Sequence, residues 1–240
     1  MPCLYPLNYT INDLEHEKIT PTMKGLFITG TDTNIGKTWI SVSLISALKR
    51  LGLDVSPRKP IESGWDNDNI ESTDAWLLAN AANKLNDLDD ICPNRFTYAV
   101  SPVRAALLES KQLSLKKIQQ DCLKNTKTTD FLIIEGAGGF YSPLCTDGLN
   151  ADLASKLKLP ILLIADNRLG CINQVLLNVE AIEKRGLLLK AIVLNDVANN
   201  DSNNMNNLED LKGYLSYPII TILHNQKSKE SFDLLATIVS

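Results

Sequence analysis

The stretch Gly25–Thr38, which reads GLFITGTDTNIGKT, constrains the fold more than any other part of the sequence. The apolar run Met23–Thr29 predicts a short buried strand that leads into it, and the segment Lys37–Leu51 predicts a helix with one apolar face that leaves it. The loop between them ends in Gly-Lys-Thr, as the phosphate-binding pattern G-x-x-x-x-G-K-[ST] does. The first glycine of that pattern would stand at position 31, where this chain has a threonine, and Gly30 comes one residue earlier.

A phosphate-binding loop has three physical requirements. Backbone N–H groups must converge on an anion, a lysine must reach the β- and γ-phosphates, and a hydroxyl must ligate Mg²⁺. A helix must also begin there, so that its positive end faces the phosphates. Lys37 and Thr38 are in place, Gly36 permits close approach of the backbone, and the displaced glycine changes only the first turn. A plain glycine turn is the alternative interpretation, but the strand–loop–helix context favours a site for a nucleoside triphosphate with Mg²⁺.

Strand-like and helical segments continue to alternate along the rest of the chain. Most of the strand-like runs carry apolar residues at consecutive positions, which indicates strands that are buried on both faces. A mostly parallel sheet with helices on both faces fits this pattern, so we expect an α/β fold of the P-loop NTPase type. The runs are Leu53–Pro60, Phe131–Gly136, Pro160–Asp166, Lys190–Asp196 and Pro218–Leu223, and the clearest helical pattern covers Ile172–Arg185.

The chain shows no internal repeat and no segment that resembles a domain linker. We therefore expect residues 23–240 to form a single ATP-binding domain, preceded by an N-terminal extension over residues 1–22 whose role the sequence does not indicate. The asparagine-rich segment Asn199–Asn207 predicts a polar surface loop, and we assign it no function.

The overall composition argues against several classes of function. The net charge is -4 and the isoelectric point is about 5.3, which argues against a nucleic-acid partner. No apolar run approaches the roughly 20 residues that span a bilayer, and the N-terminal segment lacks the pattern of a secretory signal. The five cysteines are widely spaced and form neither a disulfide framework nor a zinc motif, so we expect reduced thiols and a cytoplasmic protein.

Several polar residues stand where predicted strands end, the edge at which ligands of open parallel sheets gather. Lys59 follows the second strand and would face the phosphates opposite Lys37, although a solvated surface lysine is the alternative. Asp74 begins a helix, where it is either a cap or a Mg²⁺ ligand. Glu135 closes an apolar run before GAGG, and a carboxylate there is costly without a cation or hydrogen-bond donors; a simple turn is the alternative. The pair Asn195-Asp196 suits the edge of a purine ring, and it is also ordinary turn chemistry.

Taken in order, the motifs GTDTNIGKT, KPIESG, EGAGGFYSPL, RLGCIN and LND resemble the dethiobiotin synthetase family from about residue 24 to residue 223. The resemblance implies a single α/β domain with a seven-stranded, mostly parallel sheet, working as a homodimer. It also implies an ATP-dependent ligase of biotin biosynthesis, which joins CO2 to 7,8-diaminononanoate and closes a cyclic urea by way of a carbamate and a carbamic-phosphoric anhydride. The implied partners are these small molecules, with neither nucleic acid nor membrane.

The resemblance also implies roles for individual residues. Mg²⁺ would be held by Thr38, Asp74 and Glu135, and Lys59 and Lys37 would be the catalytic residues. ATP and its metal would be bound by Asn34, Ile35, Gly36, Lys37, Thr38, Trp39, Asp74, Glu135, Gly136, Ala137, Gly138, Asn195 and Asp196. The substrate would contact Ser63 and Gly139 and, from the neighbouring subunit, Gly170, Cys171, Ile172 and Asn173.

Four positions depart from the family pattern. Asn34 replaces a residue that is often acidic, and Val103 and Gln174 replace histidines. Leu223 stands where a proline usually lies beside the adenine. The sequence leaves the preference for a nucleotide base, and the effect of these departures, open.

Other enzymes and ATPases share parts of this pattern. A switch ATPase of the chromosome-partitioning or septum-positioning type has the same fold, but it usually carries an extra lysine early in the loop, where this chain has Thr31, Asp32 and Thr33. An amidating enzyme of corrinoid synthesis would need a glutaminase domain, for which 240 residues leave no room. A degenerate, inactive relative is the third alternative, and the retained lysines and carboxylates argue against it.

Overall fold

The structure is a computed structural model that describes residues 23–197, 205–224 and 229–240. The strands are β1 (Gly25–Gly30), β2 (Val55–Arg58), β3 (Ile61–Ser63), β4 (Asn94–Phe96), β5 (Phe131–Gly139), β6 (Pro143–Cys145), β7 (Gly148–Leu149), β8 (Ile161–Asp166), β9 (Leu189–Asn195) and β10 (Ile219–Ile222). The α-helices are α1 (Lys37–Arg50), α2 (Asp74–Ala82), α3 (Leu88–Ile91), α4 (Pro102–Leu108), α5 (Leu115–Leu123), α6 (Asn150–Leu157), α7 (Cys171–Lys184), α8 (Asn207–Lys212) and α9 (Lys229–Val239), and short 3-10 helices cover Ile70–Ser72 and Leu85–Asp87. The expected extension over residues 1–22 lies outside the described residues, as does most of the asparagine-rich segment.

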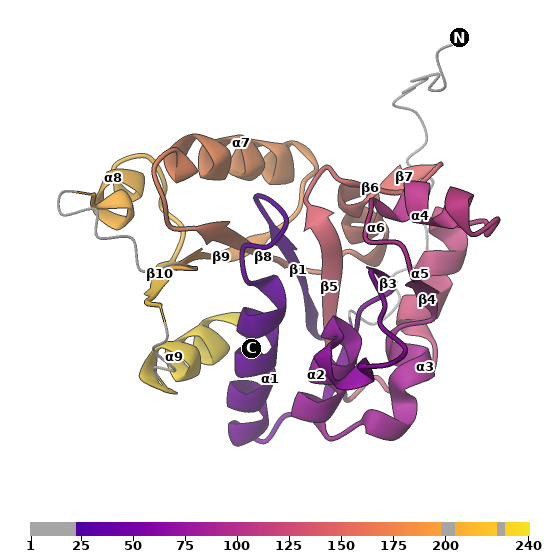
Figure 1. Cartoon of the computed structure of the whole chain (residues 1–240). Coiled ribbons are helices and arrows are strands. Elements are labelled where there is room, and N and C mark those ends of the chain that lie inside the picture. Colours follow the sequence, from indigo (N-terminus) through magenta and orange to yellow (C-terminus); the bar gives the residue numbers. More distant parts are fainter. Residues whose placement is uncertain (1–22, 198–204, 225–228) are drawn as a thin grey trace, which may run out of the picture.

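The main sheet has the strand order β10-β9-β8-β1-β5-β2, and every neighbouring pair in it is parallel (Figure 1). This arrangement confirms the α/β fold with a parallel sheet. The seven strands that the resemblance implied are not found in the described residues, where the main sheet has six. The chain beyond β2 is interrupted at Lys59 and Pro60, and β3 then pairs with β4 as a separate two-stranded sheet. Pro60 has no N–H to donate, and the N–H of Lys59 bonds to the carbonyl of Ile91 at 2.8 Å instead of to β5.

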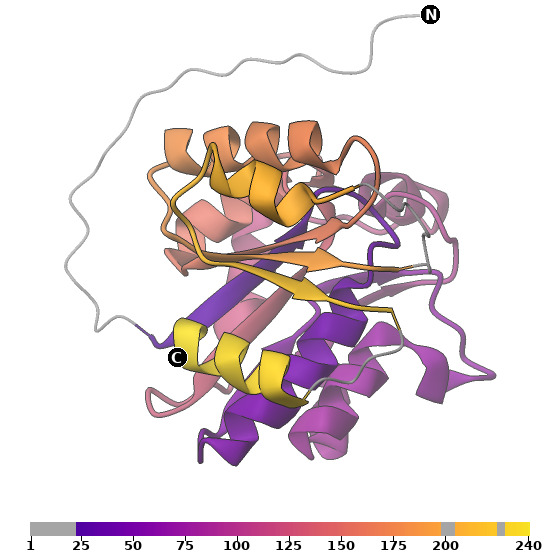
Figure 2. The same cartoon turned by 90° about the vertical axis from the view of Figure 1, so that its left-hand side faces the viewer.

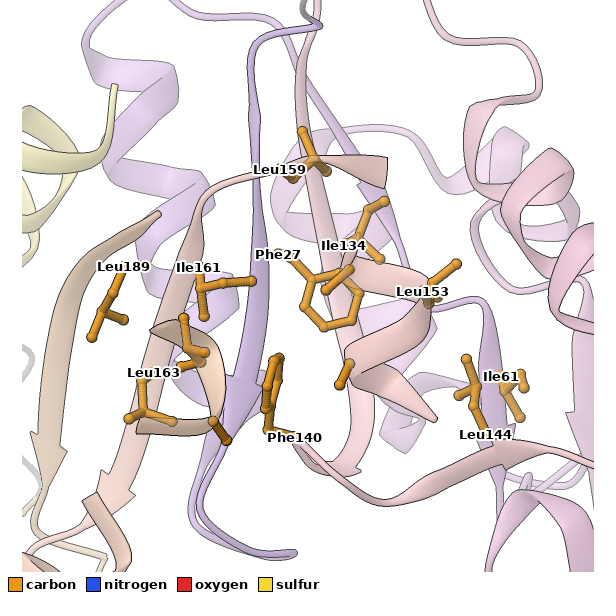
Figure 3. Close-up of a cluster of buried hydrophobic side chains, with 14 of the residues drawn as sticks. Phe27, Ile61, Ile134, Phe140, Leu144, Leu153, Leu159, Ile161, Leu163 and Leu189 are labelled. Carbon is orange, nitrogen blue, oxygen red and sulfur yellow. The ribbon is translucent and has the colours of Figure 1, made fainter. Parts of the chain in front are cut away.

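Alternate residues of the buried strands enter two different apolar cores. One face of the sheet carries side chains such as Leu26, Ile133 and Val193, which pack against α1, α2 and α9. The other face carries Phe27, Ile134 and others, which pack against α4, α5, α6 and α7 (Figure 3). Figure 2 shows the sheet between these layers, with α7 and α8 on one side and α1 and α9 on the other. The continuous apolar character of the strands follows from this burial on both faces.

The predicted helices begin and end within one residue of their observed bounds. α1 ends at Arg50, and Gly52 follows it with a φ angle of 83°, a conformation that glycine adopts at little cost. α7 begins at Cys171, one residue before the prediction, and ends one residue earlier than predicted. No helix among the described residues combines the length and the apolar character that crossing a membrane requires.

The strand order decides which loops meet. β1 lies between β8 and β5, and β5 lies between β1 and β2. Because the strands are parallel, the loop after β1, the segment after β2 and the end of β5 all reach the same edge of the sheet. The sequence motifs that follow these strands are therefore neighbours in space.

Candidate active site

The loop between β1 and α1 presents backbone donors without acceptors. The amide N–H groups of residues 34–39 have no hydrogen-bond partner among the residues that the structure describes. Asn34 and Gly36 adopt left-handed conformations, with φ angles of 58° and 84°, which turn the chain back on itself before the helix begins. A Cβ atom at Gly36 would lie 2.3 Å from Nδ2 of Asn195, so only glycine fits there. Free donors at the N-terminus of a 14-residue helix form an anion-binding site.

Lys37 is the first residue of α1, and its side chain folds back over the loop. Its Nζ donates to the carbonyl oxygen of Asp32 at 2.7 Å, so it lies beside the donors that would receive phosphates. Burial, and then the charge of Lys59, lower the pKa of Lys37 to about 8. A bound phosphate group would be a negatively charged partner for this ammonium.

A buried ion cluster joins the segment after β2 to β5 and α2. Nζ of Lys59 lies 2.6 Å from Oε1 of Glu135 and 2.7 Å from Oδ2 of Asp74. Oγ1 of Thr38, the second residue of α1, donates to the same Oε1 of Glu135 at 2.8 Å. The predicted catalytic lysine and the three predicted metal ligands are thus in direct contact. The alternative of a solvated Lys59 is wrong, since its side chain is only 6% exposed.

The protonation states in this cluster follow from its pairing. Burial alone would lower the pKa of Lys59, but Glu135 and Asp74 outweigh it and hold that pKa above its ordinary value. Burial likewise opposes ionisation of Asp74, yet the Lys59 ammonium holds the pKa of Asp74 below its ordinary value. Lys59 is therefore a cation and Asp74 an anion at neutral pH. The second oxygen of Glu135, Oε2, is buried and has no hydrogen-bond partner among the described residues.

A cavity of about 810 Å³ opens over the phosphate-binding loop and this ion cluster. Ser63 contributes a buried Oγ that has no hydrogen-bond partner among the described residues. The predicted residues that line the cavity are Asn34, Gly36, Lys37, Thr38, Trp39, Lys59, Ser63, Asp74, Glu135, Ala137 and Gly138. The lining residues that sequence reasoning did not select are Thr33, Ile61, Glu62, Ala99, Val100, Ser101, Pro102, Ser142 and Pro143.

Some predicted residues support the cavity from behind. Ile35 is buried in the core beneath the loop. Gly136 and Gly139 lie in the end of β5, next to Asn150, which is fully buried. The amide of Asn150 donates to the carbonyls of Ala137 and Gly139 at 2.6 and 2.9 Å, and so fixes the glycine-rich strand end. Sequence reasoning missed Asn150, because no motif or spacing links it to the glycines.

The predicted base-reading pair lies on the other side of the loop, outside the cavity lining. Nδ2 of Asn195 donates to the carbonyl of Ile35 at 2.9 Å, so its amide nitrogen holds the phosphate-binding loop in place. Its side-chain oxygen accepts no hydrogen bond from the described residues. Asp196 accepts at Oδ1 from Nδ2 of Asn167 at 2.7 Å. Asn167 in turn accepts from Asn207, the residue at which α8 begins.

The segment Gly170–Asn173 forms the N-terminus of α7 and does not line the cavity of its own chain. Gly170 has a φ angle of 89°, and Cys171 is buried. The preceding residue, Leu169, is 87% exposed. Within one chain, therefore, this segment is separate from the ion cluster.

Comparisons with known proteins agree with this geometry. The family model described as an AAA domain matches residues 24–231. The chain is 40% identical over 173 residues to an ATP-dependent dethiobiotin synthetase of Anaeromyxobacter dehalogenans (strain 2CP-1 / ATCC BAA-258), a match that covers 72% of this chain and 77% of that protein. It is 36% identical over 213 residues to one from Vesicomyosocius okutanii, covering 88% of this chain and 94% of that protein.

Solved structures with a similar fold have much lower sequence identity. The MinC:MinD cell division complex of Aquifex aeolicus matches with a TM-score of 0.53 at 15% identity, covering 88% of this chain and 86% of that one. A ParA family ATPase from Chlorobium tepidum matches with a TM-score of 0.50 at 15% identity, covering 90% and 91%. At such identities the likeness concerns the fold alone.

Proposed function

This chain belongs to the ATP-dependent dethiobiotin synthetase family, and from that premise we propose how its residues carry out the ring-closing carboxylation of 7,8-diaminononanoate. The chain is an ATP-dependent ligase of biotin biosynthesis. The alternative of a switch ATPase rests on a shared fold, which the ParA and MinD proteins have at 15% identity. Identity of 36–40% over most of the chain favours the ligase.

The observation that carries the proposal is the contact of Lys59 with Glu135 and Asp74 beside the phosphate-binding loop. Free loop donors and Lys37 would bind the β- and γ-phosphates. Lys59 would approach the transferred phosphoryl group from the opposite side, and its charge would favour the anionic carbamate over the neutral amine and CO2. The described residues that line the cavity include neither histidine nor cysteine, so they form no Ser-His or Cys-His pair, which suits a reaction that needs positioning and charge stabilisation.

The residues of the ion cluster fit a magnesium ion. Thr38, Asp74 and Glu135 supply only oxygen donors, and two carboxylates with a hydroxyl leave room for phosphate oxygens and water. The unpartnered Oε2 of Glu135 is a buried acceptor that a cation would satisfy. Bound there, Mg²⁺ would neutralise charge on the β- and γ-phosphates.

The chemistry requires three changes of bonding. The nitrogen of one substrate amine adds to CO2 and loses a proton, which gives a carbamate. A carbamate oxygen then takes the γ-phosphoryl group from ATP, and ADP leaves. The second amine attacks the carbamate carbon and loses a proton as inorganic phosphate leaves, which closes the urea ring. Lys59, with the buried hydroxyl of Ser63, would hold the carbamate against the phosphoryl group during these steps.

The nucleotide base would lie near the ends of β8 and β9. The side-chain oxygen of Asn195 is free of described donors and would accept from the exocyclic amine of adenine, while its nitrogen keeps the loop in place. Asp196, oriented by Asn167, would contribute to the same edge. We also propose the cytoplasm as the compartment, which the four unpaired buried cysteines among the described residues support.

We further propose that the substrate site is completed by a second copy of the chain. Residues Gly170–Asn173 lie outside the cavity of their own subunit, and the N-terminus of α7 suits a carboxylate. Exposed Leu169 and Leu177, at 87% and 58%, would be covered in such a homodimer. Sedimentation of Leu169→Asp should show monomers. Leu188→Asp alters another exposed leucine, at 59%, which lies before β9, and this variant should remain dimeric.

The reaction is tested by phosphate release from ATP in the presence of bicarbonate, with and without 7,8-diaminononanoate. Release should require the diamine, and mass spectrometry should find one dethiobiotin for each phosphate. Release that ignores the diamine would instead indicate a switch ATPase.

A further inference from the structure

The first turn of α2 has all of its backbone donors occupied. The N–H groups of Asp74 and Ala75 donate to the two carboxylate oxygens of Glu62, at 2.7 and 2.9 Å. The N–H of Trp76 donates to Oγ1 of Thr73 at 3.3 Å. The first turn of α1, in contrast, has free donors. At the start of α1, therefore, an anionic ligand can bind, whereas the start of α2 is already closed by a side chain of its own protein.

Glu62 reaches α2 from β3, the strand that begins two residues after Lys59. It is only 7% exposed, and it lines the cavity beside Ser63. One short segment thus holds Asp74 twice: Lys59 pairs with the carboxylate of Asp74, and Glu62 binds its backbone N–H. The backbone and the side chain of Asp74 are both tied to the segment that carries the catalytic lysine.

A carboxylate in this position has a cost that a neutral cap would avoid. Glu62 and Asp74 are like charges in one partly buried corner of the cavity, and such proximity is unfavourable. A threonine already caps the same helix without any charge. The bidentate contact, however, restrains two successive peptide groups, which one hydroxyl cannot do. The arrangement therefore favours a role in orientation over a role in simple capping.

We propose that Glu62 is a positioning residue for the cation site: its carboxylate fixes the first turn of α2, so that the carboxylate of Asp74 points at the space it shares with Thr38 and Glu135. This inference rests on the proposed role of Asp74 as a metal ligand. Groups that orient a metal ligand typically change metal affinity by roughly 10–100-fold when they are removed.

The test measures Mn²⁺ binding by electron paramagnetic resonance, in the presence of ADP, for the whole chain and its variants. Glu62→Ala should weaken Mn²⁺ binding about 10-fold, and should raise the Mg²⁺ concentration that gives half-maximal turnover by a similar factor. Glu62→Gln keeps an acceptor for only one of the two N–H groups and should fall between wild type and Glu62→Ala. If Glu62→Ala does not fold, Glu62→Gln alone decides, with about a 3-fold loss expected by interpolation on the same scale.

Thr73→Ala is the matched control, since it removes the other cap of the same helix. It should lower stability by about 1 kcal/mol but leave Mn²⁺ affinity within about 2-fold of wild type. Equal losses of affinity in Thr73→Ala and Glu62→Ala would mean general fraying of α2, and would overturn the proposal, as would wild-type affinity in Glu62→Ala. Wild-type affinity in Asp74→Ala would instead overturn the assignment of Asp74 as a ligand.

Discussion

Replacing Lys59 by methionine tests the ion cluster most directly. Methionine has a similar length, so Lys59→Met removes the ammonium with little loss of packing. The change leaves Glu135, which is fully buried, and Asp74, whose side chain is 38% exposed, without their shared cation. Turnover should fall by about 10²–10³-fold, because a preorganised charge beside the transferred phosphoryl group is lost.

The expected cost in stability follows from burial. Removing one partner of a buried ion pair typically destabilises a protein by about 3–5 kcal/mol. Thr38 donates to Glu135 at 2.8 Å independently of Lys59, and the side chain of Asp74 is 38% exposed to solvent, so we expect the lower end of that range. A loss of about 3 kcal/mol in a chain of this size lowers Tm by roughly 6–12 °C.

The assay is urea unfolding followed by tryptophan fluorescence, with calorimetry as a second probe. Mg²⁺ without nucleotide should stabilise Lys59→Met more than wild type, because in the variant neither carboxylate is paired with an ammonium that competes with the divalent cation. The double variant Lys59→Met/Glu135→Gln should recover at least half of the loss, since it leaves no unpaired charge in the buried position. If Lys59→Met were as stable as wild type, or if the double variant were less stable than the single one, the cluster could not be the buried pair described here.

The phosphate-binding loop leads to three further predictions. Because burial brings the pKa of Lys37 to about 8, kcat/KM for ATP should fall as the pH rises above about 8, where the free enzyme holds a neutral amine. kcat should stay level to higher pH, because bound phosphates retain the proton, and identical alkaline limits in both profiles would contradict this reasoning. Folding stability should also rise as the pH increases from about 8 to 10.5. In that range Lys37 keeps its proton in the unfolded chain but has lost it in the folded one. Gly36→Ala should weaken ATP binding at least ~10-fold, because a left-handed conformation and a Cβ placed 2.3 Å from Asn195 together force the loop to move. Calorimetric titration with ATP checks this prediction. Gly52→Ala is the control, since it alters a left-handed glycine with open space around it and should bind ATP normally.

Local features of the sequence predicted the elements that form the site. The Gly-Lys-Thr ending and its flanking apolar patterns identify β1, the loop and α1, because each depends on residues close together in the chain. Lys59 and Glu135 were found because each follows or closes an apolar run, and strand ends in parallel sheets point to one edge. The ordered motifs then identified the family, and the comparisons with known proteins confirm it.

Contacts between distant residues could not be predicted in this way. Asn195 lies 160 residues from Ile35, whose carbonyl it binds, and sequence reasoning assigned it only to the base. The side chains of Asn150 and Glu62 support the site by binding backbone groups of other segments. Every residue type has these backbone groups, so the sequence of those segments does not reveal the contact. The break at Lys59 and Pro60, which separates β3 from the main sheet, also depends on the position of a distant segment of the same chain, whose Ile91 carbonyl binds the N–H of Lys59.

By itself, the sequence determined the α/β class, the position of the phosphate-binding loop and the family. The periodicity of apolar residues and the conformations open to glycine act over a few residues and need no knowledge of the remaining chain. Only the tertiary structure decided that Lys59 bridges Asp74 and Glu135, 15 and 76 residues away. That contact depends on the order β1-β5-β2, in which β5 brings its carboxylate between the loop and the lysine, and strand order is a property of the packed sheet.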